Sequence, residues 1–173
     1  GIDLGTTNSA VCYIDTVDAR WQIHTLAIPQ VVAPGEVEAR EILPSFHYEA
    51  AVGEFARGAL RLPWDTTEPR YTVGIFARDH GGTVPGRMIT SVKSWLCHSG
   101  VDRTAAILPW HSTADVERLS PVTVSSRYLA HIAAAWNTRF PEQPLHRQEV
   151  TLTVPASFDA VARQLTVATA RQA

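Results

Sequence analysis

The chain has 173 residues, of which 45% are hydrophobic and 18% charged, and its formal net charge is −2. This length and apolar content suffice for one packed domain, and the near-neutral charge argues against nucleic acid as a partner. No stretch approaches the ~20 apolar residues of a membrane span and no signal peptide is recognisable, so we expect a cytoplasmic protein without membrane contact.

The first segment predicts a β-hairpin. Two apolar runs, at residues 1–4 and 10–14, flank a polar turn that begins at Gly5. Gly5 lets the backbone take a positive φ and lets an anion approach the main chain. The ordinary alternative is a hairpin whose turn is polar only because turns generally are.

The same turn has the composition of a phosphate site. Thr6, Thr7 and Asn8 offer backbone N–H groups and side-chain donors to phosphate oxygens. Asp3 is placed to hold the water shell of Mg²⁺, a cation that takes few carboxylates and keeps several waters. Because the turn lacks a Walker lysine and a helix directly after its glycine, it matches neither a P-loop nor a dinucleotide-binding turn.

A third strand is expected at residues 21–27, where Ile23, Thr25 and Ala27 share one face. The stretch that follows, residues 29–120, has many prolines and glycines between short apolar runs. This texture predicts an inserted subdomain of short strands, turns and one or two short helices.

Lys93 is the only lysine in a chain with fourteen arginines. A retained lysine indicates a place where a compact ammonium is needed and a planar guanidinium would not fit. Beside a γ-phosphate, such a point charge stabilises phosphoryl transfer and helps to position the attacking water. The alternative is a lysine left by chance on a helix surface.

The last third of the chain has the clearest periodicity. Pro121 opens a helical pattern that continues through Tyr128, Ile132 and Trp136. A proline-containing loop at residues 140–146 leads to a strand at 149–154, and a further helix starts at about residue 158 and runs to the end. Both termini lie within predicted elements, so we expect the chain to be a fragment.

The two cysteines, Cys12 and Cys97, lack the spacing of metal ligands, and we expect both to be thiols that pack in the interior. The seven histidines form no H-E-x-x-H or similar cluster, so a histidine metal site is not expected.

Four segments carry a resemblance to a known family. GIDLGTTNSAV at residues 1–11 resembles the first phosphate-binding hairpin of the actin, hexokinase and heat-shock-protein-70 ATPase superfamily, and within it the DnaK-type chaperones. LPSF at 43–46, VGEFA at 52–56 and TLTVPASF at 151–158 with RQ at 163–164 are similar to further segments of that family, in the family's order. Residues 65–87 depart most, which indicates a divergent member.

The resemblance implies an α/β fold, the first lobe of an actin-like (ribonuclease H-like) ATPase domain, with a central mixed sheet flanked by helices. Residues 1–28 and 121–173 would form the core subdomain of this lobe, truncated at both ends, and residues 29–120 an inserted smaller subdomain. The second lobe would follow residue 173, so the fragment alone is expected to be inactive, although the full-length protein would hydrolyse ATP.

The resemblance also implies roles for particular residues. Lys93 and Asp3 would be catalytic, with Asp3 holding Mg²⁺ through water. ATP or ADP would bind with its phosphates against the turn made of Gly5, Thr6, Thr7 and Asn8. Pro155 and Arg163 would be allosteric coupling residues, although a proline that merely ends a strand is the alternative for Pro155.

The implied partners are ATP, unfolded client polypeptides bound by a separate substrate-binding domain, a J-domain co-chaperone and a nucleotide exchange factor. Two alternatives stay open at this stage. A sugar or small-molecule kinase of the same superfamily shares the hairpin, and a nucleotide-binding, actin-like scaffold would keep nucleotide only for assembly.

Overall fold

The structure is a computed structural model in which residues 1–110, 112 and 115–173 are described; His111, Thr113 and Ala114 lie outside the described residues. It contains both helices and strands, as the sequence predicts. The strands are β1 (Ile2–Leu4), β2 (Asn8–Tyr13), β3 (His24–Thr25), β4 (Ile28–Ala33), β5 (Glu36–Arg40), β6 (Ile42–Pro44), β7 (Phe46–Glu49), β8 (Tyr71–Val73), β9 (Met88–Thr90) and β10 (Leu152–Thr153). The helices are α1 (Ile75–Gly81), α2 (Val92–Cys97), α3 (Pro121–Arg139) and α4 (Ala160–Gln172), with 3₁₀ turns η1 (Pro85–Arg87) and η2 (Leu145–Arg147).

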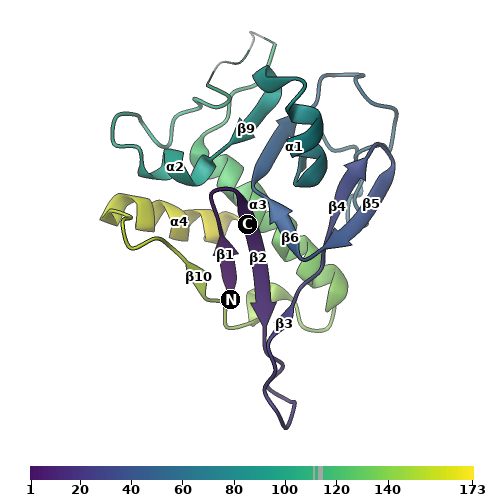
Figure 1. Ribbon diagram of the computed structural model, residues 1–173, viewed down its shortest axis with the longest axis vertical. Helices are drawn as coiled ribbons and strands as arrows, with labels where there is room; N and C mark the ends of the chain where they lie inside the picture. The colour runs from purple at the N-terminus through teal and green to yellow at the C-terminus, as the bar shows by residue number, and fades with distance from the viewer. Residues whose placement is uncertain (111, 113–114) are drawn as a thin grey trace.

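The main sheet is mixed and is built on the β1–β2 hairpin (Figure 1). β10 pairs with β1 in parallel, whereas β2 pairs with β1 in antiparallel orientation. β6 and β3 both pair antiparallel with β2, at opposite ends of that strand. The predicted hairpin at the start of the chain is therefore confirmed, and strands from distant parts of the sequence complete the sheet around it.

The two faces of this sheet differ in what covers them. Ile2, Leu4 and Val11 are buried on one face, where α3 and α4 pack together behind the sheet in Figure 1. Asp3, which alternates with the buried residues of β1, is exposed on the other face. This alternation follows from the period of two along a strand, and it leaves the polar face open.

α3 forms where the sequence predicts it. Ser120 caps its N-terminus by accepting a hydrogen bond from the Thr123 N–H at 3.0 Å, and Pro121 occupies the first turn, where no N–H is needed. The predicted apolar face, which includes Tyr128, Ile132 and Trp136, is buried. This helix supplies much of the hydrophobic core.

Residues between β3 and α3 form short strands, short helices and turns, as predicted. β4 pairs with β5, and β7 lies between β8 and β9 in a separate sheet. One hydrophobic cluster contains Leu43 and Ile89 from this stretch together with Ile132 from α3. The stretch therefore packs directly on the helices of the main sheet.

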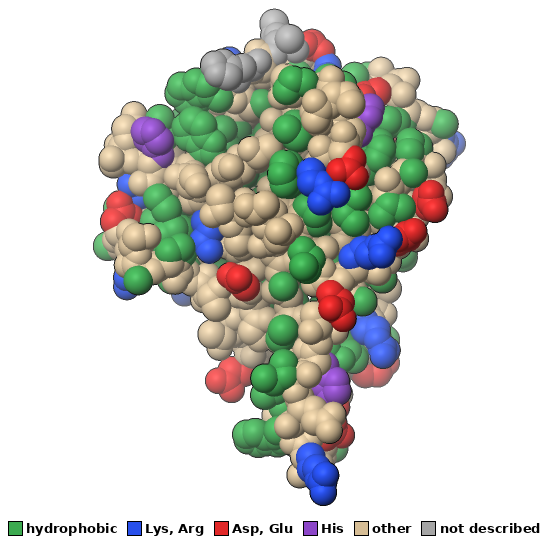
Figure 2. All heavy atoms as spheres, viewed as in Figure 1, with side chains coloured by type: hydrophobic (Ala, Val, Ile, Leu, Met, Phe, Trp, Pro, Cys, Tyr) green, Lys and Arg blue, Asp and Glu red, His purple; other side chains and the backbone are tan. Residues whose placement is uncertain are grey.

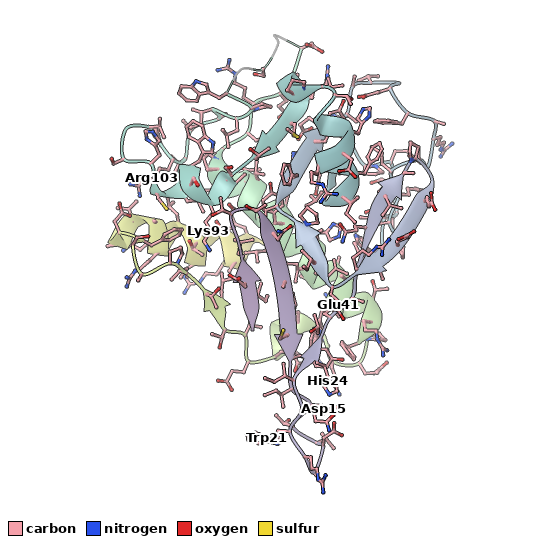
Figure 3. All side chains as sticks on the ribbon, in the orientation of Figure 1. Asp15, Trp21, His24, Glu41, Lys93 and Arg103 are labelled. Carbon is pink, nitrogen blue, oxygen red and sulfur yellow. The ribbon has the colours of Figure 1, made fainter. Side chains whose placement is uncertain are left out.

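The third strand is shorter than predicted, and Ile23, Thr25 and Ala27, which share one face as expected, are exposed. Only His24 and Thr25 pair with β2, and Ile23 is 76% exposed, whereas Leu26 is 3% exposed. Residues 14–23 instead form an arm that projects from the sheet, with Trp21 near its tip (Figure 3). The expectation that Cys12 packs in the interior is also wrong, because Cys12 lies exposed on the open face; Cys97 is partly buried.

The arm carries several exposed apolar side chains, which Figure 2 shows at the bottom of the molecule. Charged side chains of both signs are scattered over the rest of this face. Among the described residues, no helix combines the length and the apolar character that crossing a membrane requires.

Candidate functional site

The turn between β1 and β2 is tighter than an ordinary loop. A Cβ atom built on Gly5 would lie 2.0 Å from the backbone oxygen of Asn8, so no larger residue fits without moving the turn. Gly5 is not among the glycines with positive φ, so the turn does not use the left-handed conformation that glycine permits. Glycine is required here for close backbone approach.

Ser45, which follows β6, fixes this turn from the protein side. Its hydroxyl donates to the Gly5 carbonyl at 2.9 Å, and its backbone N–H donates to the Thr7 carbonyl at 2.8 Å. The Ser45 and Ser9 hydroxyls also hydrogen-bond at 3.0 Å. Ser45 is 2% exposed, so the turn carbonyls are directed inward to a buried partner.

The amide groups of the turn have no such partner. In the described part of the chain, the N–H groups of Thr6 and Thr7 donate to no protein acceptor. Thr6, Thr7 and Asn8 are exposed. With the Gly5 and Thr7 carbonyls occupied and the N–H and hydroxyl groups available, the turn presents hydrogen-bond donors to solvent, which suits an anion.

Asp3 lies on the open face, two residues before Gly5, where the turn begins. Its Oδ1 accepts a hydrogen bond from the Thr153 hydroxyl of β10 at 2.7 Å. The described residues contain no group of three or more His, Cys, Asp or Glu that could hold a metal. A single exposed carboxylate nevertheless fits Mg²⁺, which commonly takes one or two carboxylates, with waters and phosphate oxygens as its remaining ligands.

Lys93 comes from α2. Its Nζ lies 6.0 Å from the centre of the Phe158 ring, within the range of a cation–π contact. Figure 3 shows Lys93 on the α2 side of the molecule, next to α4. Among the residues described, Lys93 forms no ion pair, so its charge is available to a ligand.

Pro155 and Arg163 meet in the segment between β10 and α4. The Phe158 N–H donates to the Pro155 carbonyl at 3.1 Å, and Arg163 Nε donates to the Phe158 carbonyl at 3.1 Å. Arg163 Nη2 also donates to the Ala156 carbonyl at 3.4 Å. The structure thus brings Lys93, Pro155 and Arg163 together around Phe158.

Sequence reasoning missed an ion pair next to these residues. Arg103 donates from Nη1 and Nη2 to the two carboxylate oxygens of Asp159, at 2.9 and 2.8 Å. It also donates to the carbonyls of His98 at 3.1 Å and Cys97 at 3.4 Å. We call this group, Arg103 with Asp159 and the carbonyls of Cys97 and His98, the Arg103 clamp.

Asp159 has a second function in the clamp. It is the N-cap of α4 and accepts a hydrogen bond from the Ala162 N–H at 2.7 Å. The hydrogen bonds from Arg103 and then from Ala162 lower the pKa of Asp159 to about 2. The cap could have been predicted from an aspartate that precedes the helix, but its partner, 56 residues earlier, could not.

A different polar group lies inside the protein, at the contact of β7, β8 and α3. Arg127 donates to Glu49, contacts His47 Nε2 at 2.8 Å and lies over the Tyr71 ring at 4.0 Å. We call these four residues the Arg127 cluster. Arg127 and Tyr71 also line a pocket of about 530 Å³.

Burial controls protonation in the Arg127 cluster. Burial lowers the pKa of His47 well below its ordinary value, and the charge of Arg127 acts in the same direction. Burial also raises the pKa of Glu49, although Arg127 opposes this effect. His47 Nδ1 has no hydrogen-bond partner among the described residues.

No model of a known protein family matches the chain, and no curated protein is significantly similar to it.

Proposed function

We propose that this chain is the first lobe of an actin-like, ribonuclease H-like ATPase domain in a divergent, cytoplasmic chaperone of the heat-shock-protein-70 type. In the full-length protein it would bind ATP or ADP with Mg²⁺ and couple hydrolysis to the capture of unfolded polypeptides. A J-domain co-chaperone and a nucleotide exchange factor are the regulators that such a protein would use.

The observation that carries this proposal is the Ser45-supported turn. Its carbonyls are held inward, while the amides of Thr6 and Thr7 and three polar side chains face solvent. Preorganised N–H groups of this kind bind phosphate oxygens without reorganisation. An ordinary polar turn does not need a buried serine to direct its carbonyls away from solvent.

The surrounding residues have complementary roles in this proposal. Thr6 and Thr7 donate to phosphate oxygens, and the Lys93 ammonium offsets the charge that develops during phosphoryl transfer. Asp3, oriented by Thr153, is suited to hold the hydration shell of Mg²⁺. The ion, when bound, would neutralise phosphate charge and orient the phosphate chain.

The fold is consistent with this assignment. A mixed sheet with β1 at its centre carries helices on one face and leaves the other face open at the turn. Ligand sites of sheet proteins commonly lie at such strand ends, on loops positioned by a rigid scaffold. The likeness of the four sequence segments to DnaK-type chaperones then selects ATPase over other phosphate chemistry.

Calorimetric titration of the full natural chain with MgATP tests the proposal. Gly5→Ala should weaken binding at least ~10-fold, because a Cβ there displaces the turn and misaligns its N–H donors. Thr16→Ala, a change of another exposed threonine on the projecting arm, is the matched control and should leave affinity unchanged. Absence of MgATP binding by the wild-type protein would contradict the proposal.

Turnover measurements separate binding from chemistry. Lys93→Ala should lower kcat at least ~100-fold and leave nucleotide affinity nearly intact, as expected for a group that acts mainly in the transition state. The 173-residue chain alone should hydrolyse ATP weakly or not at all. Phosphorylation of a sugar hydroxyl, or filaments that form with ATP, would instead favour the kinase or the scaffold.

A further inference from the structure

α2, the helix that carries Lys93, has little stability of its own. It has six residues, and its N-cap, Ser91, has a left-handed backbone conformation (φ 55°) and makes no side-chain capping hydrogen bond. Helices this short do not persist in isolation, because nucleation is costly. The orientation of α2 therefore depends on its tertiary contacts.

One part of those contacts is apolar. Val92 and Leu96 are each 1% exposed and hold the inner face of α2 in the hydrophobic core. Apolar contacts of this kind are not directional, so they leave rotation and tilt of a short helix weakly specified. A directional contact outside the core is needed to fix the orientation of α2.

The Arg103 clamp supplies that contact at the C-terminal end of α2. Helix C-termini have carbonyls without intrahelical partners, and the Arg103 guanidinium donates to those of Cys97 and His98. The same guanidinium holds Asp159 by two parallel bonds, a geometry with strong angular preference. Arg103 is 9% exposed, so it is embedded between the two helices.

Lys93 lies one helical turn before this clamp. The Cys97 thiol donates to the Lys93 carbonyl at 3.3 Å, which places the two residues in register along α2. On the other side of the contact, Phe158 adjoins Asp159 and lies beneath the Lys93 ammonium. The segment from α2 to Arg103 is thus joined to the segment that begins α4 at two points, the Arg103–Asp159 pair and the Lys93–Phe158 contact; Figure 3 labels Arg103 and Lys93.

We infer that Arg103 is the positioning residue for Lys93: by clamping α2 to the N-cap of α4, it holds the ammonium over the Phe158 ring. The inference rests on the proposed function, because Lys93 is a positioned group only if it takes part in a reaction. A misplacement of about 1 Å in such a group is enough to lower a rate by up to ~100-fold.

The most selective variant is Asp159→Asn. Asparagine keeps the N-cap of α4 but removes the charge that Arg103 binds, so the helix is preserved and the clamp is weakened. Arg103→Ala removes the guanidinium of the clamp. Arg103→Lys keeps the positive charge but loses the two parallel N–H donors. Arg78→Ala is the matched control, because Arg78 also donates two bonds to an exposed aspartate, Asp79, but far from Lys93.

Steady-state ATPase assays on the full natural chain give the first readout. Arg103→Ala and Asp159→Asn should lower kcat about 10- to 100-fold with KM changed less than about threefold, and Arg103→Lys should fall between them and wild type. Arg78→Ala should leave both constants unchanged. Wild-type kcat in Arg103→Ala and Asp159→Asn would overturn the inference.

A second readout does not depend on nucleotide. In the 173-residue chain Lys93 is the only lysine, so reductive ¹³C-methylation labels it together with the N-terminal amine alone and keeps its charge. Nuclear Overhauser contacts between the N-methyl groups and the Phe158 ring should be present in wild type and in Arg78→Ala, and lost in Asp159→Asn. Contacts that persist in Asp159→Asn would overturn the inference.

The two readouts separate the two proposals. A wild-type protein that binds no MgATP, with Phe158 contacts that still depend on Asp159, would remove the proposed function and leave the clamp as the device that orients Lys93. If instead ATP turnover is present and is unchanged in the clamp variants, the proposed function stands and the positioning role of Arg103 is wrong.

Discussion

The Arg103 clamp and the Arg127 cluster use the same chemistry, an arginine held against a carboxylate, in two different surroundings. Asp159 of the clamp is half-exposed, and Arg103 lowers its pKa to about 2. Glu49 of the cluster is largely buried, and burial raises its pKa in spite of Arg127. The arginine stabilises the ionised carboxylate in both places. Only at Asp159, which is near solvent, is this stabilisation larger than the cost of desolvating the carboxylate.

This difference indicates different tasks. In the cluster, every charged group depends on its neighbours, because a buried charge without a partner is costly. In the clamp, Arg103 is buried, but Asp159 is half-exposed and Arg103 also donates to the carbonyls of Cys97 and His98, so the guanidinium depends less on the carboxylate and the pair serves mainly to orient two helices. We therefore expect variants of the cluster to affect stability, and variants of the clamp to affect the orientation of Lys93.

The largest effect should come from Arg127→Ala. The change leaves Glu49 buried without its cation, a type of loss that costs about 3–5 kcal/mol. Urea unfolding followed by circular dichroism measures it. Arg127→Met combined with Glu49→Leu should recover much of the stability, since both charges are then absent, and no recovery would mean that the cost lies elsewhere.

The next largest effect is the response of stability to acid, which should differ between the surroundings of Arg127 and the clamp. Burial lowers the pKa of His131, which lines the pocket beside Arg127, to about 4. The folded state keeps this ring neutral while the unfolded chain binds a proton below pH ~6.5, so stability is present above pH 6.5 and is lost as the pH falls toward 4. One pKa unit corresponds to ~1.4 kcal/mol, so His131 alone should account for about 3 kcal/mol over that range.

The measurement is the urea midpoint at several pH values between 7.5 and 4.5 for wild type and His131→Gln. The difference between the two proteins should shrink as the pH falls, because only wild type has this proton to bind. The clamp should be insensitive throughout, since the pKa of Asp159 is about 2 in the folded protein and the carboxylate of the unfolded chain takes up a proton only near pH ~3.8. A constant difference between the two proteins would show that His131 does not titrate in this range.

A smaller loss is expected for Ser45→Ala. The change removes a buried hydroxyl that donates to Gly5 and contacts Ser9, which should cost ~1–3 kcal/mol. Ser9→Ala is the matched comparison, because it removes only the contact between the two hydroxyls. The midpoint temperature of thermal unfolding should be lower for Ser45→Ala than for Ser9→Ala. The opposite order would mean that the hydroxyl of Ser45 does not support the turn.

The smallest change in stability should come from Asp159→Asn, which keeps the helix cap and removes the charge of a half-exposed carboxylate, while Arg103 keeps its bonds to the carbonyls of Cys97 and His98. Its midpoint in urea should lie closer to wild type than those of the preceding variants. Asp159→Ala, which also loses the cap, should be less stable than Asp159→Asn. If Asp159→Asn unfolds as readily as Arg127→Ala, the contrast between clamp and cluster fails.

The sequence predicted the elements whose signals are local. α3 has a proline in its first turn and a continuous apolar face, and the β1–β2 hairpin has a polar turn between two apolar runs. The predicted strand at residues 21–27 is too long because Trp21 and Ile23 are apolar residues typical of strands, yet they lie exposed on the arm. Periodicity reports which side chains could be buried, but the rest of the chain decides which are.

The candidate site could be predicted only in part for the same reason. Asp3, the turn and Lys93 stand out through short motifs and composition. Ser45 and the partners of Arg103 do not, because Ser45 is 40 residues from Gly5 and Arg103 is 56 residues from Asp159. Supports of this kind arise from tertiary contacts, which no local pattern encodes.

The projecting arm also has a practical consequence. Beyond the Cys12–Thr25 and Tyr13–His24 pairs, the chain leaves the sheet and returns without contributing to the buried core. Its tip is therefore the place where a peptide epitope or a reporter domain can be spliced in with least disturbance to the fold. An attachment point at Val17, which is 87% exposed, lies at the opposite end of β2 from the turn and leaves the open face accessible.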